Sequence, residues 1–160
     1  MAWDPPSEEV VELTARDRPS LFWPGVLAGI GLAGTLDEVV LHQLLGWHHF
    51  YDRSTPTAGL VSDGLFHLFS TTLLVIGVIQ LVERRRTSPD PPRLALAGIL
   101  LGAGGFNLYD GTIQHKVLGF HQVRAGVPDN LPYDLAFLAI AAALALAGAL
   151  LLRQVRQPTP

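Results

Sequence analysis

Two segments of the chain, 73 positions apart, share the pattern G-x-G-x5-D-x4-H-x2-L-G-aromatic-H. The polar members of this pattern are Asp37, His42, His48, Asp110, His115 and His121. Imidazole nitrogens suit several transition metals, and carboxylate oxygens are also common metal ligands. The pattern therefore predicts a transition-metal site, in which Asp37 and Asp110 are candidate catalytic groups that act as a base or orient the ligands.

A second match, at an offset of 71 positions, aligns Asp63 with Asp134 and His67 with Leu138. Because a helix rises about 1.5 Å per residue, these positions sort into layers of different depth. The rim layer, at the outer end, is expected to hold His48, His121, Asp63 and Asp134. The middle layer is expected to hold His42, His67 and His115. The floor is expected to hold Asp37 and Asp110, with Glu38 and Asn107 nearby.

Three imidazoles from three helices match the usual catalytic metal arrangement, in which three protein ligands leave one position open. The three expected ligands are His42, His67 and His115, with the rim residues as further ligands. The aspartates of the floor could accept the second ring N–H of these histidines or bind a second ion, so the same residues allow a dinuclear site. The residue types do not choose between Zn, Cu(II), Fe and Mn.

Other interpretations use the same residues. Two histidines on facing helices could ligate a haem iron, although four nearby aspartates suit hard or borderline cations better than an apolar porphyrin. Asp/His chains inside a membrane are typical of proton relays, but the cytoplasmic halves of the spans contain no matching chain of polar residues. A non-catalytic storage or delivery protein would use exposed ligands such as His48 and His121. A buried structural polar network is the remaining alternative.

Four apolar stretches are long enough to position these residues inside a membrane, since about 20 helical residues cross a hydrocarbon core of about 30 Å. The four stretches are Leu21–Trp47, Asp63–Val82, Leu94–Phe120 and Tyr133–Leu152. A polar side chain in hydrocarbon is costly and usually turns inward to a partner. The His/Asp residues are therefore expected to meet inside the helix assembly.

The two offsets predict an internal repeat whose unit is a helical hairpin. We expect an all-α, integral membrane four-helix bundle, in which repeat one (21–82) and repeat two (94–153) are related by a pseudo-twofold axis along the membrane normal. The transmembrane domain would then cover 21–153. A polar or interfacial segment (1–20) precedes it, and a cytoplasmic tail (154–160) follows.

Charge and composition limit the location and the partners. Arginines collect before the first stretch, between the second and third, and after the fourth, which predicts that both termini are cytoplasmic. The net charge is -3 and no basic face is visible, so nucleic acid is not an expected partner. The chain has no cysteine and its one methionine is Met1, which argues against a Cu(I) carrier.

Four motifs resemble a family of bacterial predicted membrane proteins known as domain of unknown function 2243. They are Trp47-His-His-Phe-Tyr-Asp-Arg-Ser, Ser62-Asp-Gly-Leu-Phe-His67, Gly104-Gly-Phe-Asn-Leu-Tyr-Asp-Gly and Leu131-Pro-Tyr-Asp-Leu. The resemblance covers about Pro24 to Leu152 and implies a multi-pass protein of the bacterial inner membrane. It also implies a respiratory or metal-related role, since members of the family occur near oxidase-assembly and copper-handling genes.

Taken together, the residues predict an integral membrane protein with a His/Asp-rich transition-metal site near the outer face. The site would belong to a metalloenzyme or redox centre, or to a metal storage or delivery protein linked to respiratory oxidase assembly. The expected partners are the lipid bilayer, the metal ion, and a second copy of the chain or a respiratory-chain protein.

Overall fold

The structure, a computed structural model, describes residues 20–157, and every regular element in this range is a helix. In chain order these are α2 (Phe22–Asp37), the π-helix η1 (Glu38–Leu44), α3 (Pro56–Arg85), α4 (Pro92–Tyr109), the π-helix η2 (Asp110–Leu118) and α5 (Leu131–Arg156). The all-helical class is confirmed for these residues. Nearly all of the expected segment 1–20 and the last residues of the expected tail lie outside the described range, and 154–156 belong to α5.

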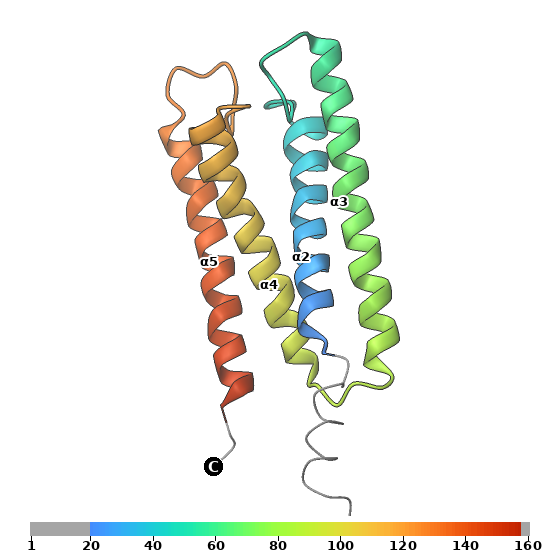
Figure 1. The fold of residues 1–160 in the computed structure, drawn as a ribbon. Coiled ribbons are helices and arrows are strands. Elements are labelled where there is room, and N and C mark those ends of the chain that lie inside the picture. The colour runs from blue at the N-terminus through green and yellow to red at the C-terminus, as the bar shows by residue number, and fades with distance from the viewer. Residues whose placement is uncertain (1–19, 158–160) are drawn as a thin grey trace, which may run out of the picture.

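The helices lie side by side in a row. Helices α2 and α4 pack against each other in the middle, α3 packs on α2, and α5 packs on α4 (Figure 1). No substantial packing joins α3 to α5 within the part of the chain that the structure describes. The order α3–α2–α4–α5 is therefore an open row.

Glycines bring the two central helices into backbone contact. A Cβ at Gly25 or Gly29 would overlap a carbonyl oxygen of α4, and one at Gly98 or Gly102 would overlap a carbonyl oxygen of α2. Small residues spaced four apart allow this close approach of helices in a membrane. The α2–α4 contact therefore fixes the two halves of the chain against each other.

Both central helices widen into a π-helix where the His/Asp pattern lies. Asp37 and His42 are five residues apart, as are Asp110 and His115. In an α-helix, residues five apart point about 140° away from each other. The i→i+5 hydrogen bonds of a π-helix, such as the one of 2.9 Å from Leu45 N to Val40 O, bring such residues onto one face. The local geometry thus places each histidine beside its aspartate.

Three helical stretches are long and apolar enough to cross a membrane: Phe22–Leu44, Pro56–Arg85 and Leu131–Arg156. Helix α4 is not one of them. It carries Arg93 in its first turn and Asn107 in its last. Large apolar side chains are exposed along the outer helices, for example Leu68 and Phe69 on α3 and Leu135 and Ile140 on α5. Such a surface suits contact with lipid chains.

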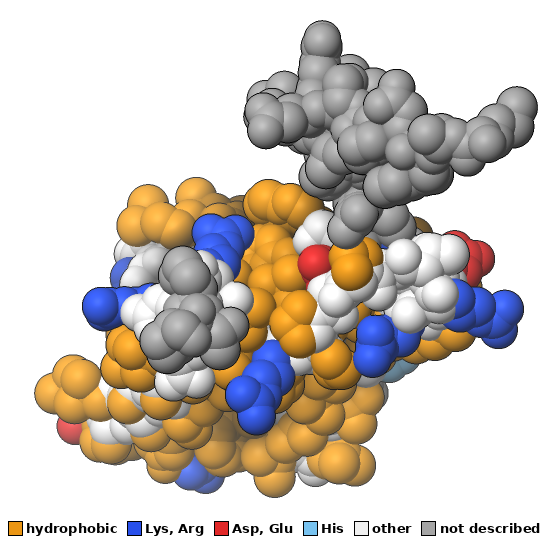
Figure 2. All heavy atoms as spheres, turned by 90° about the horizontal axis from the view of Figure 1, so that it is seen from below, with side chains coloured by type: hydrophobic (Ala, Val, Ile, Leu, Met, Phe, Trp, Pro, Cys, Tyr) orange, Lys and Arg blue, Asp and Glu red, His pale blue; other side chains and the backbone are white. Residues whose placement is uncertain are grey.

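The two ends of the row differ in character. Ser20 and Gln157, the limits of the described chain, lie at the end that also carries the link between α3 and α4 (Figure 1). Figure 2 views this end, and Lys/Arg side chains surround it. The arginines of this region are Arg84, Arg85, Arg86, Arg93, Arg153 and Arg156. The loops 45–55 and 119–130 lie at the opposite end, next to the histidines.

Candidate metal centre

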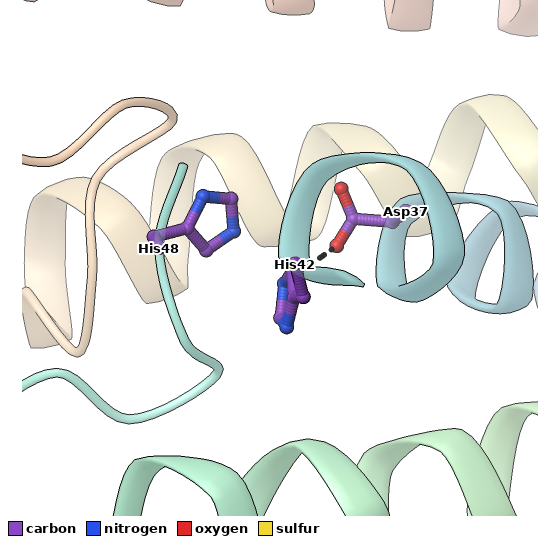
Figure 3. Close-up of side chains that lie close together, drawn as sticks. All are labelled: Asp37, His42 and His48. Atoms are coloured by element: carbon purple, nitrogen blue, oxygen red, sulfur yellow. Dashed lines mark ion pairs between the residues drawn. The ribbon is translucent and has the colours of Figure 1, made fainter. Parts of the chain in front are cut away.

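The first His/Asp group consists of Asp37, His42 and His48. One ligand atom of each lies within 4.8 Å of the others. Asp37 ends α2, His42 lies on η1, and His48 comes from the following loop, which folds back over the helix end. The Asp37 carboxylate and the His48 ring point toward one another beside His42 (Figure 3). The loop therefore brings an expected rim residue to the same place as a middle and a floor residue.

Carboxylates lie on both sides of the His42 ring, and the two nearest ones contact Nδ1. His42 Nδ1 is 3.1 Å from Asp63 Oδ1 and 2.9 Å from Glu38 Oε2. An ionised carboxylate can only accept a hydrogen bond, so these two contacts favour the neutral tautomer in which Nδ1 carries the hydrogen and Nε2 carries the lone pair. His42 Nε2 lies 3.3 Å from Asp37 Oδ2 without hydrogen-bond geometry and has no hydrogen-bond partner among the described residues.

The same reasoning applies to His48. Its Nδ1 donates to the Val123 carbonyl oxygen at 2.9 Å, so its Nε2 carries the lone pair. This Nε2 is buried and has no hydrogen-bond partner in the described structure. Burial, together with the neighbouring His42 and His121 rings, lowers the pKa of His48 to about 3. The ring is therefore neutral at physiological pH and presents a free nitrogen lone pair.

The first group thus collects acceptors without donors. A carboxylate oxygen of the half-buried Asp37 and the Nε2 lone pairs of the buried His42 and His48 lie close together. Unpaired acceptors in a protein interior are costly, and a cation bound between them would satisfy all three. Two neutral imidazoles and one carboxylate are a known ligand set for a catalytic transition metal. The residues present therefore fit a metal ion.

The second group consists of Asp110, His115 and His121, and all three are buried. His115 Nε2 is 2.9 Å from Asp110 Oδ2 and also 2.9 Å from His121 Nε2. His121 Nδ1 donates to the Phe50 carbonyl oxygen at 2.9 Å, so its Nε2 also faces the group as an acceptor. Burial lowers the pKa of His121, although the nearby charge of Asp110 acts to raise it.

The two groups touch through their loop histidines. The rings of His48 and His121 stack with centroids 4.6 Å apart and an interplanar angle of 7°. Each loop is also tied to the other by its backbone, since Ala125 N donates to Trp47 O at 2.8 Å and Asp52 N donates to Phe120 O at 3.0 Å. The loops 45–55 and 119–130 therefore close jointly over both groups.

The two His/Asp groups differ in the residues that surround them. In the first group, Asp63 and Glu38 contact His42 Nδ1. Asp63 also accepts a hydrogen bond from His49 Nδ1 at 2.5 Å. In the second half of the chain, Asp134, the counterpart of Asp63, instead forms an ion pair with Lys116. His115 Nδ1 has no hydrogen-bond partner among the described residues. Among the described residues, a carboxylate therefore contacts Nδ1 of the helix-borne histidine in the first group but not in the second.

The structure groups the expected residues differently from the sequence-based layers. His67 is exposed on α3 and belongs to none of the His/Asp groups found in residues 20–157, so it does not join His42 and His115. Glu38 forms a third group with His42 and Asp63, and His49 is a partner of Asp63, roles that the sequence did not indicate. The spacing of Glu38 four residues before His42 is the signal that could have indicated the first of these roles.

The fold and its apolar surface define a helical membrane protein that contains buried His/Asp groups. Comparison with protein families agrees: residues 24–155 match the family described as predicted membrane protein (DUF2243), and the chain belongs to this family. The resemblance seen in the sequence is thereby confirmed. The chain matches no curated protein and no solved structure.

Proposed function

We propose that the protein binds a transition-metal ion in the membrane, and that Asp37, His42 and His48 are its ligands. The observation that carries this proposal is the pair of buried, unpartnered Nε2 atoms of His42 and His48 beside the Asp37 carboxylate. Asp37, which the sequence analysis expected to act as a base or to orient the ligands, is assigned here as a ligand. When bound, the metal would act as a Lewis acid or redox centre with an open coordination position.

Asp63 and Glu38 have a supporting role in this proposal. Both lie next to His42 Nδ1, at 3.1 and 2.9 Å, and a carboxylate in this place fixes the ring orientation and raises the basicity of the coordinating nitrogen. The N and O donors suit Zn, Cu(II) and Fe. They lack the sulfur ligands that Cu(I) prefers.

We assign the second group, Asp110, His115 and His121, to a second and weaker ion site. The support is its matching spacing and its contact with the first group through the stacked His48 and His121 rings. The two halves of the chain are, in this proposal, tandem hairpin repeats related by a pseudo-twofold axis. Glycine contacts and loop hydrogen bonds that recur 73 positions apart support it.

The proposed setting is the inner membrane of a bacterium, with both termini in the cytoplasm and the metal centre near the outer face. The arginines at the end of the row that carries the α3–α4 link support this orientation. The continuous helical segment of α4 and η2 would be the fourth span, held between α2 and α5 rather than against lipid.

A metalloenzyme or redox centre is favoured over a storage or delivery protein. A delivery protein needs ligands that a partner can reach, whereas His48 and His121 are only 5% and 4% exposed. Haem ligation is not favoured either, since a stacking distance of 4.6 Å between these rings leaves no space for a porphyrin and its iron. A proton relay would use the same residues without a metal.

Elemental analysis of detergent-purified protein, with an absorption spectrum of the same sample, tests the proposal. We expect one or two transition-metal ions per chain and no Soret band. A metal-free, colourless protein that takes up no added Zn, Cu(II) or Fe would contradict the proposal and favour a structural or proton-relay network. A Soret band would replace it with haem.

A further inference from the structure

An apolar cleft of about 450 Å³ opens beside the first His/Asp group. Its walls come from α2, η1, α4 and α5, and exposed apolar side chains surround its mouth, among them Leu36 and Ile140. The two polar residues in its lining are Asp37 and Asn107. In a membrane, this cleft would open toward the lipid chains rather than toward water.

Two of the residues that line the cleft differ from their counterparts in the other half of the chain. Ala33 lines it, whereas the residue 73 positions later is Phe106, whose ring stacks on Phe66 with centroids 6.1 Å apart. Asn107 also lines it, whereas the matching residue of the first half is Gly34. The side of the row that contains the cleft therefore has one aromatic ring fewer and one side-chain amide more than the other side.

The polar end of the cleft contains a hydrogen-bond acceptor without a partner. Asn107 Oδ1 is buried and has no hydrogen-bond partner among the described residues. Asp37, the other polar residue of the lining, is also a member of the first His/Asp group. A buried acceptor without a partner is unfavourable, so its presence in an otherwise apolar cleft indicates a ligand that donates a hydrogen bond.

We propose that the cleft binds a bilayer-dissolved molecule with an apolar body and a hydroxyl or phenol head group. The O–H group donates to Asn107 Oδ1, and the apolar body lies between Leu36, Ala33 and Ile140. This inference names the substrate class of the proposed metal centre and rests on that proposal, because Asp37 is what connects the cleft to the metal ligands. Entry is lateral, from the membrane.

An acyl chain of an ordinary phospholipid is the competing occupant. It would fill the apolar volume equally well but would bring no donor to Asn107. The two occupants therefore differ in one measurable property, which is the dependence of binding on a hydroxyl group.

Photolabelling in lipid nanodiscs tests the inference. The probe is an alkylphenol that carries a diazirine on its chain, and labelled residues are mapped by mass spectrometry. We expect labelling of residues that line the cleft. Unlabelled para-hexylphenol should compete at least tenfold better than para-hexylanisole, which has the same body but no O–H donor. Equal competition by the two compounds would overturn the proposal in favour of an acyl chain.

Two variants and their controls link the label to the cleft. Ala33→Phe introduces the ring that the other half already carries at Phe106, and Asn107→Leu removes the acceptor. Both should reduce labelling of the cleft at least fivefold. Leu68→Phe and Thr72→Leu, in a separate groove on α3, are the matched controls and should leave it unchanged. Undiminished labelling in both cleft variants would contradict the proposal.

Metal content measured on the same samples separates this inference from the metal proposal. If the chain holds metal but the phenol does not label the cleft, the substrate assignment fails and the metal centre stands. If the phenol labels the cleft in a chain that holds no metal, the metal centre fails and the cleft remains a binding site.

Discussion

At the scale of single residues, the proton position on each histidine determines what the site can bind. His42 and His48 each direct Nδ1–H to an oxygen, one to a carboxylate and one to a backbone carbonyl. Both Nε2 atoms are left as buried acceptors beside Asp37. A metal centre needs this state of the imidazole, because a protonated ring nitrogen cannot coordinate.

Replacing Asp63 should weaken the metal centre although Asp63 is not one of the three proposed ligands. Asp63→Asn removes the carboxylate behind His42 Nδ1, so we expect a 10- to 100-fold loss of metal affinity in a chelator competition assay. Asp134→Asn is the matched control, because Asp134 pairs with Lys116 and contacts no histidine of either group in the described ion pairs. Equal losses in the two variants would contradict the assigned role.

The sequence identified most of the residues of the centre but not their grouping. The repeated spacing selected Asp37, His42 and His48, and all three lie together. Depth counted along ideal α-helices, however, placed these residues in three different layers and added His67. The π-helical turn and the folded-back loop cancel those differences in depth, and neither feature has a clear signal in a single sequence.

At the scale of helices, contact between α2 and α4 determines how the two groups meet. The glycines of this contact allow the carbonyl oxygens of one helix to touch the other helix. The π-helices η1 and η2 extend the same two helices and lead into the loops that carry His48 and His121. The packing of α2 against α4 and the geometry of the two His/Asp groups are therefore connected.

A methyl group in this contact should destabilise the protein. In Gly102→Ala the new Cβ would overlap the Val26 carbonyl oxygen, which we expect to cost about 1–3 kcal/mol. Gly105→Ala, one turn further along α4, is the control, since a Cβ there meets no atom within 4 Å and should stabilise the helix by about 0.5–1 kcal/mol. Thermal unfolding in detergent measures both. A stable Gly102→Ala protein would be evidence against the close contact.

At the scale of the whole molecule, the exposed apolar side chains of the outer helices and the arginines at one end are typical of a membrane protein. The sequence predicted this class from its apolar stretches, and three of the four stretches meet the criteria of length and hydropathy in the structure. It did not indicate the order α3–α2–α4–α5, because the apolar stretches alone do not specify which helices pack against each other.

The orientation can be tested with single cysteines, since the chain contains none. Ser54→Cys lies in the loop beside the metal centre, and Thr87→Cys lies in the link between α3 and α4; both positions are exposed. A membrane-impermeant maleimide should label Ser54→Cys in intact cells and Thr87→Cys only after permeabilisation. The reverse pattern would place the centre at the cytoplasmic face.

The ratio of metal to chain in three purified proteins tests the central claim most directly. The wild-type protein should hold at least one transition-metal ion per chain, and the double variant His42→Ala/His48→Ala should hold at least one ion fewer while still inserting into the membrane. His67→Ala, which removes an exposed histidine outside the centre, should keep the wild-type ratio. An unchanged ratio in the double variant would contradict the assigned ligands.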